Sequence, residues 1–75
     1  MNDERRKKIK VIITKINSCV DDLTLVKDDE DEARENTPEN LQSADAYSIS
    51  QEYSDKMDDI ITDLQEAVTA LQDLI

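Results

Sequence analysis

The chain has 75 residues, and its 19 acidic and 9 basic residues give a formal net charge of −10. A chain this short forms at most one small domain, and it contains no histidine, the side chain most suited to acid–base work at neutral pH. No apolar run approaches the roughly 20 residues that cross a bilayer, so we expect no membrane span and a cytoplasmic protein.

The first predicted helix covers about residues 3–35. Asn2 or Asp3 can cap its start, and from Ile9 the apolar residues recur at the three- and four-residue spacing of a helix. Because this spacing weakens after Val26, we expect the last third of the helix to be its least tightly packed part. Cys19 is assigned a structural role on the seam. The predicted seam is Ile9, Ile12, Ile16, Cys19, Leu23, Val26, Glu30 and Ala33, widened by Ile13 and Val20.

The centre of the chain, residues 36–43, predicts a turn and holds the only proline. Proline disfavours helical dihedrals in the preceding residue, so Pro38 ends the first helix. A capping hydroxyl on Thr37 and proline at the first helical position predict one helical turn. We expect Leu41 to fold inward over the end of the hairpin, and either Ser43 or Ser48 to cap the helix that follows.

The second predicted helix covers about residues 44–74 and repeats the apolar spacing. The chain is therefore expected to be one all-α domain, 1–75, folded as an antiparallel two-helix hairpin in which residues 5–15 face acidic residues near the end of the second helix. Since such a hairpin has no closed interior, we also expect a homodimer that forms a four-helix bundle. The predicted seam is Tyr53, Met57, Ile60, Leu64, Ala67, Leu71 and Leu74, widened by Ile61, Val68 and Ile75.

For each of three kinds of site, catalytic, metal-binding and nucleic-acid-binding, the chain lacks a residue type or arrangement that the chemistry requires. Adjacent carboxylates such as Asp58 and Asp59 point to different sides of a helix. Residues 28–39 carry acids at calcium-loop positions, but Ala33 stands where that loop needs glycine. The basic residues 5–15 have no aromatic neighbours for base stacking. We expect no enzyme activity, no cofactor, no specific metal site and no direct binding to nucleic acid.

The charge is unevenly distributed. Residues 1–20 carry six basic and two acidic groups, whereas residues 21–75 carry three basic and seventeen acidic groups. A helical rod with acids on each turn resembles the charge row of duplex DNA, which presents one charge per ~1.7 Å. The alternative is an acidic face that only keeps the protein in solution. The candidate partner-binding residues are Asp28, Asp29, Glu30, Asp31, Glu32, Asp55, Asp58, Asp59 and Asp63.

The segment EARENTPENLQ at residues 32–42, followed by DDIITDLQEAVTALQDLI at residues 58–75, resembles small acidic helical-hairpin proteins of bacteriophages and mobile elements of Gram-positive gut bacteria. Asn36, Pro38 and the residues from Glu39 to Gln42 match the turn of that group. Residues 43–50 depart from it, since serines and Tyr47 replace a more charged stretch.

The resemblance implies the cytoplasm of a bacterial host. A separate analogy, with small acidic phage proteins as a class, predicts an inhibitor of a host nucleic-acid-binding enzyme, such as a DNA mimic or an anti-CRISPR-like protein. The partner expected from the charge is a basic protein that binds nucleic acid. The alternative is a self-associating structural or assembly protein with no inhibitory activity.

Overall fold

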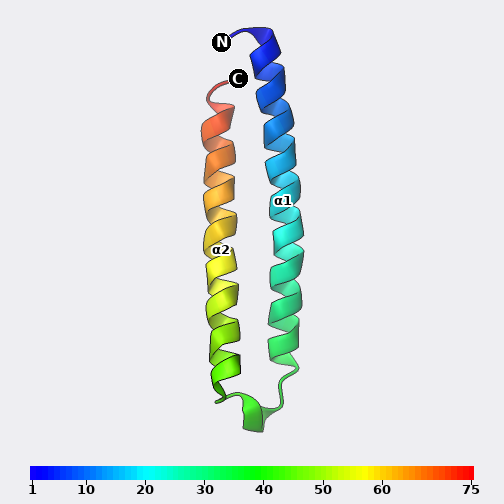
Figure 1. The fold of residues 1–75 in the computed structure, drawn as a ribbon, viewed down its shortest axis with the longest axis vertical. Coiled ribbons are helices and arrows are strands. Elements are labelled where there is room, and N and C mark those ends of the chain that lie inside the picture. The colour runs from blue at the N-terminus through cyan, green and yellow to red at the C-terminus, as the bar shows by residue number, and fades with distance from the viewer.

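The computed structural model describes residues 1–75 as two long antiparallel helices joined by a short helical turn (Figure 1). Helix α1 is Asp3–Glu35, the 3-10 helix η1 is Glu39–Leu41, and helix α2 is Asp45–Gln72. The two termini lie at the same end of a rod that measures 60 × 15 × 11 Å (Figure 1). The prediction of an all-α antiparallel hairpin is confirmed. Neither helix has an apolar stretch long enough to cross a membrane.

The caps of the helices differ in part from those predicted. The Asn2 side chain accepts a hydrogen bond of 2.9 Å from the Arg5 amide and caps α1. The Thr37 hydroxyl donates to the carbonyl of Ala33 in the preceding helix, so it does not cap η1. The residue before α2 is Ala44, which has no side-chain hydrogen bond, and the predicted serine caps are wrong.

The turn stays ordered through backbone hydrogen bonds. The Leu41 amide donates to the Pro38 carbonyl at 2.8 Å, and the Ala44 amide donates to the Leu41 carbonyl at 3.1 Å. These bonds continue from η1 into α2, which removes the need for a side-chain cap. Half of the Leu41 surface remains exposed, so this residue does not seal the end of the hairpin as predicted.

The helices contact each other along a seam that keeps every second residue of the predicted one and is displaced by one residue at the positions between them. Ile12, Cys19 and Val26 of α1 are exposed, and so are Tyr53 and Ile60 of α2. Apart from Thr24 and Asp31, which lie beside the seam, the buried and half-buried residues of the two helices again recur at alternating steps of three and four. They are Ile9, Ile13, Ile16, Val20, Leu23, Lys27, Glu30 and Arg34 in α1, and Tyr47, Ser50, Ser54, Met57, Ile61, Leu64, Val68 and Leu71 in α2.

The core of the hairpin is thin. Only four residues are buried, and the three apolar ones are Ile13, Val20 and Val68. Each helix covers one stripe of the other and leaves the rest of its apolar residues in water. Apolar burial in the isolated chain is therefore concentrated in a few side chains.

The expected charge match between residues 5–15 and the end of α2 does not form ion pairs. Arg6 pairs with Asp3 at 3.2 Å and Lys8 with Glu4 at 3.8 Å, both within α1. The ion pair that joins the helices is Lys27 with Asp58, at 3.6 Å. The short turn and the seam therefore fix the antiparallel orientation, without help from charges near the termini.

Candidate functional site

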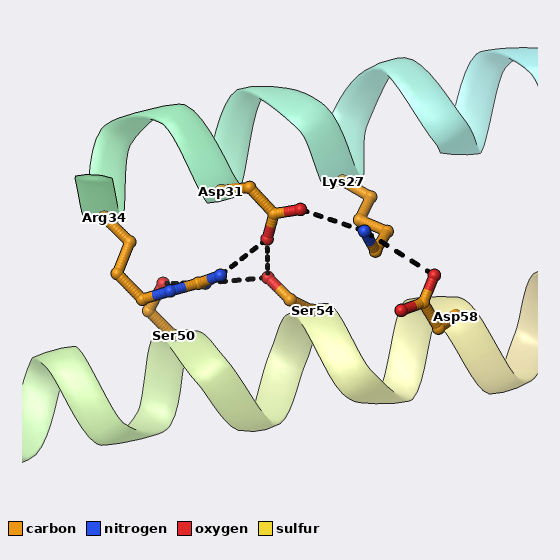
Figure 2. A network of polar contacts seen from close by, with 6 residues as sticks. All are labelled: Lys27, Asp31, Arg34, Ser50, Ser54 and Asp58. Atoms are coloured by element: carbon orange, nitrogen blue, oxygen red, sulfur yellow. Dashed lines mark hydrogen bonds and ion pairs between the residues drawn. The ribbon is translucent and has the colours of Figure 1, made fainter. Parts of the chain in front are cut away.

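A network of polar side chains occupies the seam in the half of the hairpin nearest the turn (Figure 2). Asp31 and Arg34 project from α1 toward Ser50 and Ser54 of α2, and Lys27 projects toward Asp58 (Figure 2). Lys27 and Arg34 stand at seam positions that hold isoleucine or valine nearer the termini, and small serines face them across the seam. A serine leaves room for a long basic side chain where two large side chains would collide.

Asp31 is the centre of this network. One of its oxygens, Oδ1, accepts from the Ser54 hydroxyl at 2.6 Å and from Arg34 Nη2 at 2.7 Å. Its other oxygen, Oδ2, accepts from Lys27 Nζ at 2.9 Å. Arg34 Nη1 also donates to Ser54 Oγ at 2.8 Å and to Ser50 Oγ at 3.1 Å. Each polar group in this part of the seam therefore has a partner, and Ser54 is almost fully buried.

Contacts within the network shift the pKa values of Asp31 and Lys27. The hydrogen bond from Ser54, followed by those from Lys27 and Arg34, holds the pKa of Asp31 well below its ordinary value. The hydrogen bond to Asp31 raises the pKa of Lys27 above its ordinary value. Both groups are therefore charged throughout the neutral range, so the network does not offer a proton-transfer group that titrates near pH 7.

The stability that Asp31 contributes is expected to depend on acidity. Since the pKa of Asp31 is lower in the folded chain, the unfolded chain binds more protons as the pH falls below about 4. The contribution is therefore complete above that pH and is lost as the pH falls further toward the folded-state pKa. The melting temperatures of the wild-type chain and Asp31→Asn should differ most at neutral pH and converge below pH 4. A difference independent of pH would contradict this.

The nine candidate acids do not form a single surface. Asp31 and Asp58 contact Lys27 on one flank of the hairpin, and Asp28 and Asp55 lie one helical turn from them on the same side. We call this side the polar flank, defined by Asp28, Asp31, Asp55 and Asp58. Two of these four carboxylates are already paired inside the protein, which leaves Asp28 and Asp55 free to meet a partner.

The other five acids point elsewhere. Glu30 is half-buried in the seam. Asp29 lies one turn from Val26 and Asp63 one turn from Ile60, which places both on the side opposite the polar flank. Glu32 and Asp59 occupy the outer faces of α1 and α2. The acidic surface therefore surrounds the rod and does not form one row.

Sequence reasoning missed the roles of Lys27, Arg34, Ser50 and Ser54. A signal for them exists, because polar residues interrupt the apolar spacing of both helices at similar distances from the turn. Two interruptions that meet across a hairpin predict a polar network. The last third of α1 has little apolar packing, as expected, but the network takes its place.

The calcium-like window does not form a loop, because residues 28–35 continue helix α1. No group of three or more histidine, cysteine or acidic side chains converges in the structure as metal ligands would. Comparisons with family models, with curated proteins and with solved structures found no match to this chain.

Proposed function

We propose that the chain is an acidic protein-binding module that inhibits a basic, nucleic-acid-binding enzyme by occupying its nucleic-acid channel. The observation that carries the proposal is the charge of the half of the hairpin near the turn. Residues 21–57 carry twelve acidic and three basic groups, a net charge of −9. Two of the three bases, Lys27 and Arg34, are paired within the hairpin. The field outside this half is therefore strongly negative.

The spacing of carboxylates on α2 supports the same proposal. Glu52 and Asp59 stand seven residues apart on its outer face, about 10 Å from each other at 1.5 Å of rise per residue. They belong to one long helix, so their spacing is set before a partner arrives and little ordering is lost on binding. The proposed setting is the cytoplasm of a bacterial host.

The test is reversal of exposed acids that have no structural partner. We expect the variant Asp28→Lys, Asp55→Lys and Asp59→Lys to fold normally, because none of these carboxylates forms an ion pair in the hairpin. Immobilised wild-type chain should capture nucleic-acid-binding enzymes from nuclease-treated bacterial lysate. Salt and added duplex DNA should release them, and the triple variant should capture none. Mass spectrometry identifies the captured proteins, and an activity assay on each then measures inhibition.

A matched control reverses three acids near the termini, Asp3→Lys, Glu66→Lys and Asp73→Lys. It changes the net charge by the same amount but leaves the half near the turn acidic. We expect this control to retain most of the capture. Equal capture by both variants, or capture indifferent to DNA, would overturn the proposal of a nucleic-acid mimic.

A second candidate function, self-association in a structural or assembly protein, is supported by a different observation. Large apolar residues remain exposed on both helices, among them Ile12, Val26 and Ile60. Competition separates the two candidates, because an apolar contact between copies is not displaced by DNA and is not weakened by salt in the way that a charged contact is.

A further inference from the structure

A strip of exposed apolar residues runs along the side of the hairpin opposite the polar flank. The antiparallel pairing brings Asp31 beside Ser54 and Asp58 beside Lys27. Asp31, four residues after Lys27, and Asp58, four residues after Ser54, therefore lie on the same side of the hairpin. Residues directly before alternate seam residues, namely before Ile13, Val20, Lys27 and Arg34, then share the other side. We call this side the apolar flank. In α1 it consists of Ile12, Cys19, Val26 and Ala33.

The equivalent residues of α2, and Leu74 just beyond its end, are also apolar. They are Tyr53, Ile60, Ala67 and Leu74, and all eight residues of the apolar flank are exposed. Val26 and Tyr53 each expose more than half of their surface, at 55% and 57%. A continuous apolar strip along both helices is a surface that water covers poorly, so it favours contact with another protein surface.

The excess of solvent-exposed area over that of a compact monomer gives the size of the surface that a partner could cover. The chain exposes 5717 Å², about 1,000 Å² more than the roughly 4,700 Å² expected for a compact monomer of this mass. A standard interface removes about 800 Å² from each partner. One further copy of the hairpin, laid along the apolar flank, would remove an area of this size.

Charges beside the apolar flank indicate the direction of that copy. Lys8, Lys15, Asp22 and Asp29 lie at seven-residue intervals along α1, two basic residues followed by two acidic ones. Lys15, Asp22 and Asp29 have no ion-pair partner within the hairpin. A copy that runs in the opposite direction brings basic residues to acidic ones. A copy with its turn at the same end would bring together two halves that each carry a net charge of −9.

We infer that the apolar flank binds a second copy of this chain, with α1 antiparallel to α1 of that copy, to form a four-helix bundle. The two-fold axis passes between Ser18 and Cys19, near the middle of α1. In this register Lys15 faces Asp22 of the second copy, and Lys8 faces its Asp29. Ile12 lies beside Val26 of the second copy, and the two Cys19 side chains meet near the axis. The inference is tested separately from the acidic-surface proposal, because its contacts use Asp22 and Asp29 and none of the acids reversed in the capture experiment.

The first test exchanges charges across the two-fold axis. We expect the wild-type chain to sediment as a dimer, and Lys15→Glu to raise the dimer dissociation constant roughly tenfold, because two attractive contacts become repulsive. Adding Asp22→Lys should restore the wild-type value, since the exchanged pair is attractive again. Circular dichroism checks that helix content is unchanged. A wild-type chain that is monomeric at every concentration, or a double variant no tighter than Lys15→Glu, would overturn the inference.

The second test uses Cys19, the only cysteine, as a reporter of the axis. Mild oxidation should convert the wild-type dimer rapidly into a disulfide-linked dimer. The matched control combines Cys19→Ser with Asn17→Cys, which moves the thiol to the side of the polar flank. We expect little cross-linking of this control. Equal rates for both chains would overturn the proposed register, and the capture experiment above would be unaffected by that result.

Discussion

The Ile13→Ala variant is expected to lower the free energy of unfolding by roughly 2–5 kcal/mol, the range for shortening a buried isoleucine to alanine. Ile13 is 8% exposed and is one of only three buried apolar residues. A core of this size has little redundancy, and domains below about 80 residues rarely exceed 3–5 kcal/mol of stability. Urea unfolding followed by circular dichroism should therefore show a variant that is partly unfolded before denaturant is added.

The control for Ile13→Ala is Val11→Ala, two residues away on the outer face of α1. Val11 is 53% exposed and lies neither in the seam nor on the apolar flank. Its replacement should change the free energy of unfolding by less than about 0.5 kcal/mol. If the two variants lose the same stability, the assigned seam is wrong and the predicted seam through Ile12 should be tested in its place.

The Arg34→Ala variant is expected to lower the free energy of unfolding by about 1–3 kcal/mol, because partly buried polar groups lose their partner. Ser50 and Ser54 lose a donor, and Asp31 loses its 2.7 Å ion pair. Thermal unfolding measures the effect. Arg34→Lys should restore only part of it, since an ammonium group cannot reproduce the forked geometry of a guanidinium that contacts both helices.

A triple variant tests whether the network stabilises the fold or selects its alignment. Replacing polar groups together with apolar ones removes the cost of burying them unpaired, so Arg34→Leu with Asp31→Ala and Ser54→Ala should recover the stability lost in Arg34→Ala. If the network selects alignment, this variant should also show helices that slide by one heptad, seen as additional sets of NMR signals. One set of signals with unchanged contacts would leave the network with a purely energetic role.

The network and the apolar flank are consequences of the same choice of seam. When Lys27 and Arg34 enter the seam, Val26 and Ala33 are turned out of it. The seam chosen therefore determines which residues meet the second helix and which remain for a second copy. It also commits Asp31 and Asp58 to internal contacts, which removes them from the acidic surface offered to other proteins.

The sequence by itself determined the two helices, the turn between them and the antiparallel hairpin. Asn2, the apolar spacing and Pro38 are local signals, and each acts on backbone conformation within a few residues. The uneven charge is likewise a property of composition. These features depend on local sequence and on composition, and not on tertiary contacts, so the sequence is sufficient to predict them.

Only the tertiary structure decided which of two apolar stripes on each helix became the seam. The chain carries apolar doublets, such as Ile12–Ile13, Ile60–Ile61 and Ala67–Val68, and either member suits a helix with a half-buried face. The sequence of one helix does not determine which member of each doublet faces the other helix. The choice depends on the partner across the seam, where Lys27 and Arg34 require carboxylates and small hydroxyls at matching heights. Because that match joins residues up to 31 positions apart, it exists only once the hairpin has closed.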